Sequence, residues 1–419
     1  MKKLLMICIP LITLTYAGGL GAFIDHAQKS NGQIKAKEFT IKSKAQEVES
    51  AKSAYWPTLD VGGSYSAVNP SSIVQPGRTA TVYAGVHLEL YDGGRKAAVL
   101  KAKSYAKEAS FFEKEAFSKS VTLQIVQYYY TIKKLQANLH ALKERSKELK
   151  AQIVRVKRFK LTGLATQEAV DKLQAVYDNN RYTMENVSLN IQTARENLRL
   201  LSGIDATHLG NSRFVTPHGV HFEWFDAIKI MRAQAKAVGE NAKAIDANYL
   251  PQVGVSDTYH RSNFDDTTTL PPLPGLGGSD AFLIDHQNEV KLSLNMRLFD
   301  KGRMKHESEA VRLQKLALES ELAHAKKEQL MHFKIAGKTL VTTRAKMKSA
   351  KSALRAAEST YRTIRKKFEA GLVDDIAYLD ALAQKTLAEA RYKETLYDYE
   401  IKKSLYYYYA GKDPREFVR

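Results

Sequence analysis

Cysteine is nearly absent from this chain of 419 residues, which contains only Cys8. Two lysines at the start precede an apolar run at residues 4–15 and a small-residue motif that ends at Ala17. This order is typical of a secretory signal peptide at 1–17. We therefore expect a mature chain that begins near Gly18 and has no cysteine. Such a chain has no disulfides and no thiolate ligands, which excludes thiol chemistry and Cys-ligated metals.

Long apolar runs are also missing. Beyond the signal segment, no stretch reaches the roughly 18 apolar residues that a membrane-spanning helix needs, so any membrane span would consist of strands. The net charge of +19 is spread over long lysine-bearing segments rather than gathered in one patch. This distribution favours a solvated helical surface. Together with the export signal, it argues against a nucleic-acid partner.

The chain carries one arrangement of motifs twice. Three landmarks recur 208 residues later in the same order: Asp92-Gly93-Gly94-Arg95 as Asp300-Lys301-Gly302-Arg303, Gly163-Leu164 as Gly371-Leu372, and Leu201-Ser202-Gly203 as Tyr409-Ala410-Gly411. Upstream, Pro57 corresponds to Pro251 at an offset of 194, so the second copy has 14 extra residues in a Pro/Gly-rich loop. This pattern predicts two supersecondary units that are unlikely to bury their apolar faces alone.

The repeat predicts the division of the chain. We expect a signal peptide at 1–17, a first repeat at 18–203, a linker at 204–226 and a second repeat at 227–419. Within the repeats we expect strands at about 58–91 and 251–298 and helical hairpins at about 95–203 and 303–411.

The predicted strands alternate apolar and polar side chains with a period of two, the pattern of strands in a membrane barrel. The side chains predicted to face lipid are Val82, Val86, Leu88 and Leu90 in the first copy and Val290, Leu292, Leu294, Met296 and Leu298 in the second. Aromatic residues gather at one end of the strands, as at a membrane interface: Tyr55, Trp56, Tyr91, Tyr249 and Phe299. Four strands cannot close a barrel, so several chains must share one; two would supply eight strands and three would supply twelve.

The remaining segments have the three-and-four spacing of a coiled-coil seam. In the first copy the seam comprises Val121, Ile125, Tyr128, Ile132, Leu135, Leu139, Leu142, Leu149, Ile153 and Val156. In the second it comprises Leu340, Thr343, Met347, Ala350, Leu354, Ala357, Tyr361, Ile364 and Phe368. One helix over 95–160 would be about 100 Å long. The glycine of each Gly-Leu pair can end the helix and reverse the chain.

These residues predict an α+β membrane protein, a tandem repeat of long coiled-coil hairpins with two β-hairpins per chain. Over nearly all of its mature length the chain resembles the TolC family of outer-membrane efflux proteins. The resemblance rests on the duplicated leading helix, strand pair, Asp-Gly-x-Arg helix start and Gly-Leu tip. It implies a homotrimer whose shared twelve-stranded β-barrel continues into an α-helical periplasmic tunnel.

The resemblance also implies partners and sites. The tips Gly163, Leu164, Gly371 and Leu372 would contact a periplasmic membrane-fusion adaptor, which couples the duct to an inner-membrane transporter, expected to be a proton-driven pump. Acidic residues just past the second tip would line a pore constriction: Asp374, Asp375 and Asp380. Only Asp380 stands where the family has a frequent aspartate, because Ala377 occupies the other such position.

Alternatives remain open on the sequence alone. The outer-membrane duct of a type I protein-secretion system would have the same outer component. A periplasmic coiled-coil scaffold would have its alternating segments in a soluble sheet. Asp380 could face outward and pair with a lysine such as Lys385. No nucleophile elbow, paired-carboxylate cleft or dinucleotide-binding motif is present, so the sequence predicts neither an enzyme nor a cofactor or metal site.

Overall fold

The computed structural model describes residues 18–268 and 283–419. The predicted signal peptide and most of the Pro/Gly-rich loop, including its three prolines and Gly275, lie outside these residues. The chain divides into two compact units. We call them the helical unit (Met1–Glu38, Glu113–Ile228 and His324–Arg419) and the sheet unit (Phe39–Phe112 and Lys229–Ala323). Each unit contains parts of both copies.

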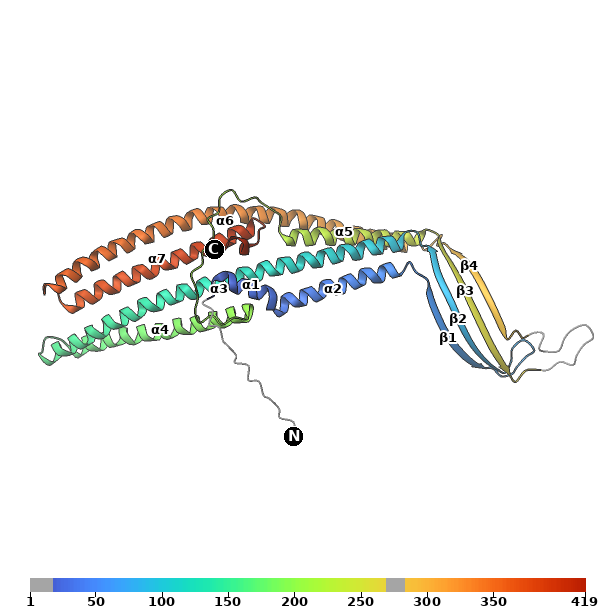
Figure 1. Ribbon diagram of the computed structural model, residues 1–419, viewed down its shortest axis with the longest axis horizontal. Coiled ribbons are helices and arrows are strands. Elements are labelled where there is room, and N and C mark those ends of the chain that lie inside the picture. The colour runs from blue at the N-terminus through green and yellow to red at the C-terminus, as the bar shows by residue number, and fades with distance from the viewer. Residues whose placement is uncertain (1–17, 269–282) are drawn as a thin grey trace, which may run out of the picture. The chain divides into compact units, whose positions relative to one another are not determined.

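Two helical hairpins are the largest elements. In the first copy α3 (Arg95–Leu161) is followed by α4 (Gln167–Ser202), and in the second α6 (Arg303–Glu369) is followed by α7 (Asp375–Tyr409). Both α3 and α6 contain 67 residues, and their ends are displaced by the same 208 positions as the sequence landmarks. The predicted long helix and its reversal at the Gly-Leu pair are present in both copies (Figure 1).

A shorter helix precedes the strands of each copy. In the first copy α1 (Leu20–Ser30) and α2 (Gly32–Ser53) are separated at Asn31, whose side-chain oxygen accepts hydrogen bonds from the backbone N–H groups of Gln33 and Ile34. In the second copy α5 (Asp226–Asp246) leads into the 3₁₀ turn η1 (Ala247–Tyr249), and a second 3₁₀ turn, η3 (Pro414–Phe417), lies near the C-terminus. None of the helices within the described ranges has the length and apolarity that a membrane crossing requires.

The four strands form one antiparallel sheet in the order β1-β2-β3-β4, and Figure 1 shows them side by side. They are β1 (Thr58–Ala67), β2 (Arg78–Tyr91), β3 (Gln252–Asp265) and β4 (His286–Asn295). The sequence predicted the two hairpins, and the structure adds the pairing of β2 with β3, which joins the copies. Within the described residues β1 and β4 each have one unpaired edge, so the sheet is open on both sides.

β4 is shorter than the sequence predicted, because Met296 and Leu298 lie beyond its end at Asn295. Asn295 pairs with Gln252, the first residue of β3, and Pro251 before it has no N–H to donate. In the first copy β2 continues to Tyr91, because its last residues pair with β3, the neighbouring strand of the second copy. Met296 and Leu298 continue the apolar–polar alternation of β4 in sequence but do not belong to the strand. β3, in turn, extends to Asp265, two residues past Asn263, where the sequence predicts that the Pro/Gly-rich loop begins.

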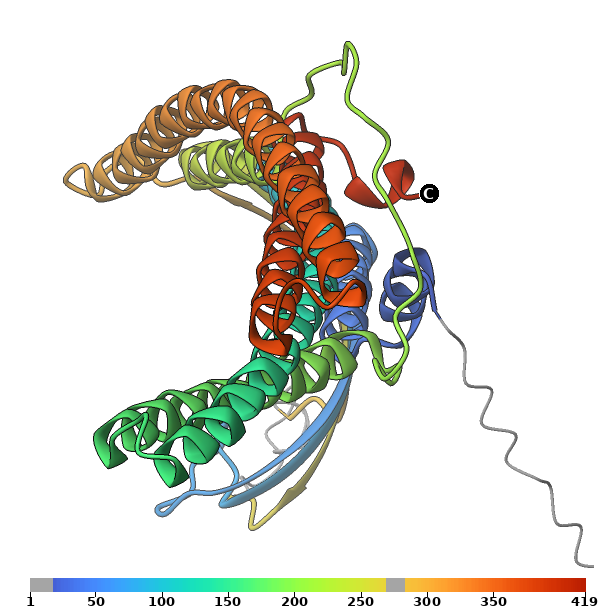
Figure 2. The same ribbon diagram turned by 90° about the vertical axis from the view of Figure 1, so that its left-hand side faces the viewer.

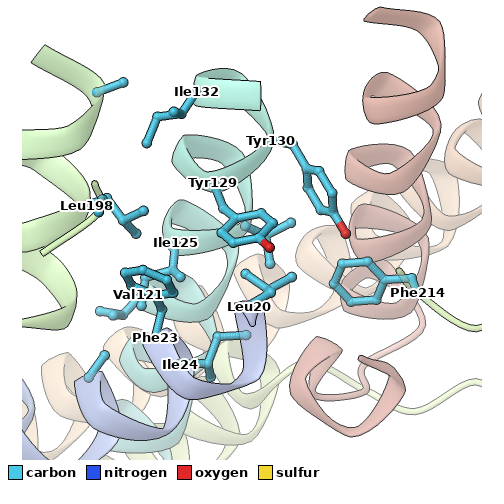
Figure 3. Packing of buried hydrophobic residues seen from close by; sticks show 14 of the residues in the cluster. Leu20, Phe23, Ile24, Val121, Ile125, Tyr129, Tyr130, Ile132, Leu198 and Phe214 are labelled. Carbon is cyan, nitrogen blue, oxygen red and sulfur yellow. The ribbon is translucent and has the colours of Figure 1, made fainter. Parts of the chain in front are cut away.

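The main hydrophobic core lies in the helical unit, where α1, α3 and α4 meet the linker between the copies. Ile125 and Ile132 of α3 face Phe23 of α1 and Leu198 of α4, and all four side chains are fully buried (Figure 3). Tyr130 is also buried in the core, and its hydroxyl donates to the carbonyl oxygen of Ser212 in the linker at 3.0 Å. The predicted seam of the first copy thus forms the centre of the core.

Candidate functional site

The two tips are copies of one turn. Gly163 and Gly371 have left-handed backbones, with φ of 76° and 70°, a conformation that favours glycine. The next N–H group reaches back five residues in both copies, from Leu164 to the Phe159 carbonyl at 2.9 Å and from Leu372 to the Lys367 carbonyl at 2.8 Å. Figure 2 views these turns from their own end of the helical unit.

Both leucines project away from their hairpins. Leu164 is 77% exposed and Leu372 is 74% exposed. A Cβ atom placed on either tip glycine would meet no atom within 4 Å, so the glycines serve the backbone conformation rather than close packing. The turns therefore present two large apolar side chains on a surface that needs no internal packing partner.

Asp374 has a structural role at the start of α7. Its carboxylate accepts a hydrogen bond from the Ala377 N–H at 2.9 Å and caps the helix, as Thr166 caps α4 in the first copy. It also accepts a hydrogen bond from the Arg155 guanidinium of α3. These two contacts, the backbone one first, lower the pKa of Asp374. Asp375 is the first residue of α7, and its side chain lies outside the described part of the chain.

Asp380 belongs to a charged cluster between α3 and α7. One of its carboxylate oxygens lies 3.8 Å from Arg145 Nη1, and its side chain is 54% exposed. Arg145 also donates to Glu148, which is buried and accepts a second hydrogen bond from Gln152 Nε2 at 2.6 Å. Burial raises the pKa of Glu148; the Asp380 charge adds to this effect, while the Arg145 contact opposes it.

The alternative interpretation paired Asp380 with Lys385, but these two side chains do not form an ion pair in the structure. The Lys385 ammonium group lies 5.0 Å from the centre of the Tyr361 ring. The partner of Asp380 is instead an arginine of the other copy. A further ion pair joins the same two helices, from Lys134 Nζ of α3 to Asp398 Oδ1 of α7 at 2.7 Å. The α3–α7 ion pairs therefore form a row of contacts between the two copies: Lys134 with Asp398 and Glu394, Arg145 with Asp380, and Arg155 with Asp374.

Sequence analysis missed Arg145, Glu148 and Arg155. Each lies among many charged residues of a helix whose exposed faces are expected to be charged, and spacing within one helix does not identify the neighbour on another. The capping role of Asp374 had a detectable signal, because an aspartate directly before a helix is a preferred N-cap.

The strand face predicted to contact lipid is apolar and solvent-exposed in the single chain. Val86 pairs with Leu59 of β1, while Leu292 of β4 pairs with Val255 of β3, so these side chains share one face of the sheet. The exposed members of this face include Leu59, Val61, Val82, Val86, Val290, Leu292 and Leu294. Asp257 and Arg261 of β3 interrupt it, which the sequence analysis did not note. Asp257 stands between Val86 and Val290 in the same row.

The opposite face is polar and has close-fitting aromatic contacts. The Tyr83 ring crosses over Gly62 of β1, where a Cβ atom would lie 2.5 Å from the ring. The same ring lies 5.8 Å from that of His260 on β3. Across residues 18–268 and 283–419, no three His, Cys, Asp or Glu residues are grouped so that they could hold a metal ion.

A family model described as "Outer membrane efflux protein" matches residues 23–204 and 226–405. This match covers most of the chain and both copies. The chain belongs to the outer membrane efflux protein family. The resemblance drawn from the repeated motifs is thereby confirmed, together with the outer-membrane location and the efflux-channel class. A search of curated proteins found no match.

Solved structures of outer-membrane proteins have the same fold. The VceC protein of Vibrio cholerae is 16% identical, with 94% of this chain and 96% of that chain covered and a TM-score of 0.74. The CmeC channel of Campylobacter jejuni is 15% identical, with coverages of 94% and 85% and a TM-score of 0.77. The open state of the MtrE channel of Neisseria gonorrhoeae is also 15% identical, with coverages of 94% and 89% and a TM-score of 0.69. The mostly helical fold with one small antiparallel sheet is thus the predicted one.

Proposed function

We propose that three copies of this chain form a passage through the outer membrane, and that it serves as the channel component of a tripartite efflux system for small molecules. One observation carries the proposal: the four-stranded sheet has two open edges and an apolar exposed face. Unpaired backbone groups in lipid are costly, so spanning sheets close into barrels. Pairing β4 of one chain with β1 of the next would close a twelve-stranded barrel.

The polar face of the sheet would then line the passage, while the helical hairpins would continue it as a periplasmic tunnel. The tips Gly163, Leu164, Gly371 and Leu372 would be the contact points for a membrane-fusion adaptor. Two exposed leucines per chain supply apolar anchors that an adaptor surface could bury. An inner-membrane transporter, expected to be proton-driven, would supply the energy and direction of transport.

Asp380 would lie at the constriction in this arrangement, where three copies around the axis would attract cations and repel one another. Asp374 would contribute by holding α7 to α3 through Arg155. Opening the tunnel would require separation of the α3–α7 ion pairs, at least at the Arg145–Asp380 and Arg155–Asp374 end. Asp375 would add to the same negative field.

Single-channel recording of the detergent-purified protein in a planar bilayer tests the passage. We expect discrete openings whose cation selectivity falls when Asp380→Asn removes the ring charge. Asp398→Asn is the matched control, because it removes another α7 carboxylate that pairs with α3. Equal effects of the two substitutions would remove Asp380 from the constriction, and a protein without currents would refute the passage.

Export measurements in cells test the adaptor contact. Leu372→Glu replaces an exposed apolar side chain with a charge that an apolar adaptor surface would have to desolvate. We expect loss of export with unchanged single-channel currents. Retained export would remove Leu372 from the adaptor contact.

A further inference from the structure

The two copies treat the junction between the sheet and the long helix differently. In the first copy Glu89, near the end of β2, neutralises the cations at the start of α3. One of its carboxylate oxygens lies 3.2 Å from Arg95 Nη2 and 3.2 Å from Lys96 Nζ. Lys96 also donates to the backbone carbonyl of Glu89 at 3.0 Å. In the first copy, the cations at the start of α3 therefore already have a carboxylate partner from the end of β2.

The second copy has a cation in place of that carboxylate. The residue 208 positions after Glu89 is Arg297, and the counterpart of Arg95 is Arg303. Among the described residues no carboxylate comes within the 4.0 Å ion-pair distance of either guanidinium. Arg297 has one weak contact, from Nη1 to the Met304 sulfur at 3.7 Å. The second copy therefore has two arginines, Arg297 and Arg303, at the positions where the first copy has the Glu89–Arg95 ion pair.

The closest acidic residue in sequence, Asp300, is already engaged. Its carboxylate accepts hydrogen bonds from the N–H groups of Gly302 and Met304 at 2.9 and 3.1 Å and from the Tyr249 hydroxyl at 3.0 Å. Partial desolvation raises the pKa of Asp300, but these hydrogen bonds and the nearby charge of Arg303 together lower it. The carboxylate is thus held at the start of α6 by donors other than the two guanidinium groups, and it offsets part of the Arg303 charge without forming an ion pair with it.

Arg297 and Arg303 line one pocket of about 480 Å³ within the sheet unit. Gln252 and Asn295, which face each other across β3 and β4, contribute amide groups to the same pocket. Glu307 also lines it, so its charged side chains sum to one positive charge. A guanidinium group binds carboxylate and phosphate oxygens through paired N–H donors. Two of them beside amide groups make a pocket suited to an oxyanion.

We propose that this second-copy junction pocket binds a soluble oxyanion of the phosphate or carboxylate class through Arg297 and Arg303. Gln252 and Asn295 pair directly, and their alternation along the strands puts them on the polar face, opposite Val253 and Leu294. A polar-face position favours a dissolved anion over a lipid phosphate. The choice of a dissolved anion over a lipid phosphate rests on the proposed function, in which this face lines the passage; binding of an oxyanion by the two arginines does not.

Arginine modification of the full-length detergent-solubilised protein tests the pocket, with inorganic phosphate as the probe. Phenylglyoxal labels accessible guanidinium groups, and peptide mass spectrometry locates the label. We expect phosphate to slow the labelling of Arg303 in the unchanged protein. Arg297→Glu recreates the ion pair of the first copy, and we expect it to weaken this phosphate protection by about tenfold or more, since charged hydrogen bonds contribute about 1.5–3 kcal/mol. Arg95, already paired, should show no phosphate protection.

Lys291→Glu is the matched control. It makes the same charge change on β4, on the face that carries the pocket residue Asn295, but Lys291 itself lies outside the pocket. It should leave the protection of Arg303 intact. Equal labelling of Arg303 with and without phosphate in the unchanged protein would overturn the proposal. So would equal loss of protection in Lys291→Glu and Arg297→Glu, which would indicate a general field rather than a pocket.

A second arm separates the possible sources of the anion. Vesicles of phosphatidylethanolamine and phosphatidylglycerol replace phosphate in the same assay. Protection by vesicles alone would overturn the soluble-anion proposal in favour of a lipid headgroup. Phosphate protection in a protein that shows no channel currents would support the anion-binding pocket and refute the passage. Channel currents without phosphate protection would support the passage and refute the pocket.

Discussion

The long helices of the two copies have the same length and the same offset, yet they bury their seams differently. In α3, Ile132 is 0% exposed and Leu149 is 1% exposed. Their counterparts in α6 are Leu340, which is half-buried, and Ala357, a smaller side chain. The helical unit covers the α3 seam with α1, α4 and the linker. The duplicated backbone therefore has two different packing roles: α3 organises the core of its own chain, and α6 retains a partly exposed apolar seam, which further chains would cover in the proposed trimer.

The charges along the hairpins differ in the same way. Arg145, Glu148 and Arg155 of α3 correspond to Ala353, Ala356 and Thr363 of α6. Asp374 and Asp380 of α7 correspond to Thr166 and Lys172 of α4. The residues of α6 and α4 at the equivalent positions therefore cannot repeat these ion pairs. One set of helix faces is specialised for contact between the copies within a chain.

Truncation of equivalent core residues should give the largest contrast. Ile132→Ala leaves a cavity in a fully buried site, where such changes cost about 2–5 kcal/mol. Leu340→Ala removes a half-buried side chain. In the dissociated chain we expect it to lower the free energy of unfolding by about 1 kcal/mol, because only about half of the side-chain area is buried there. Thermal unfolding in detergent measures both. Equal losses in the dissociated chain would contradict the difference in burial between the two seams. A larger loss for Leu340→Ala in the assembled protein would indicate that other chains bury Leu340.

The turns before α3 and α6 should respond in opposite directions. Gly93 has a left-handed φ of 69°, and a Cβ atom there would lie 2.5 Å from the Ala247 carbonyl oxygen. Gly93→Ala should therefore destabilise the fold by about 3 kcal/mol, combining backbone strain with overpacking.

The second-copy counterpart of Gly93 is Lys301, which adopts φ of 57°. Because a side chain costs about 1–2 kcal/mol in this conformation, Lys301→Gly should stabilise the fold by about 1 kcal/mol, offset in part by unfolded-state entropy. Unfolding midpoints of the two variants check the pair. A stabilising Gly93→Ala or a destabilising Lys301→Gly would contradict the assigned turn geometry.

The pH dependence of stability should distinguish two carboxylates of the α3–α7 contacts. Burial raises the pKa of Glu148, so the folded chain holds this proton more tightly than the unfolded chain. The stability that this group contributes increases as the pH falls through its raised pKa toward 4.5, the ordinary pKa of a glutamate side chain. Glu148→Gln should remove that gain. Parallel stability curves for the two proteins would contradict the buried, protonatable state.

Asp374 should give the opposite sign. Hydrogen bonds from the Ala377 N–H and Arg155 lower its pKa. The stability that it contributes is therefore present above 3.8, the ordinary pKa of an aspartate side chain, and is lost as the pH falls through the lowered pKa. Asp374→Asn should flatten this acid loss. The equivalent first-copy substitution, Thr166→Val, should leave the pH profile unchanged because threonine does not titrate in this range.

Helix capping should give the smallest effects. Thr166→Ala removes the side-chain oxygen that accepts from the Ala169 N–H at 3.2 Å, and it should cost about 1 kcal/mol. Asp374→Ala removes a cap and the Arg155 contact together, so its cost should be the larger of the two. Unfolding midpoints near neutral pH compare them. A Thr166 effect that equals or exceeds the Asp374 effect would show that the Arg155 contact adds no stability.

Much of the fold follows from the sequence because the landmarks are local. The Gly-Leu tips, the seam spacing of α3 and the period-two strands each depend on neighbouring residues, and their repetition strengthens each interpretation. The pairing of β2 with β3 does not follow in this way, since it joins residues about 170 positions apart without a turn between them. The early end of β4 coincides with Pro251, which directly precedes the partner strand β3.

The candidate site could be predicted only in part. The Gly-Leu pairs predicted the two tip turns, and the tip leucines are exposed there. Their contact with an adaptor remains a prediction. For the aspartates, sequence gave no means to find Arg145 or Arg155 as partners, because an ion pair between helices depends on which faces meet. The partner of Asp380 is Arg145 of α3, which the sequence of α7 does not identify. The place of Asp380 in a constriction remains a prediction.

We propose that other copies of the chain complete the open sheet and cover the half-buried α6 seam. Native mass spectrometry of the detergent-solubilised protein counts the chains in the assembly without assuming a function. We expect a species of three chains that persists when detergent is exchanged. A single chain as the stable species, or two chains as the largest, would contradict the shared twelve-stranded barrel.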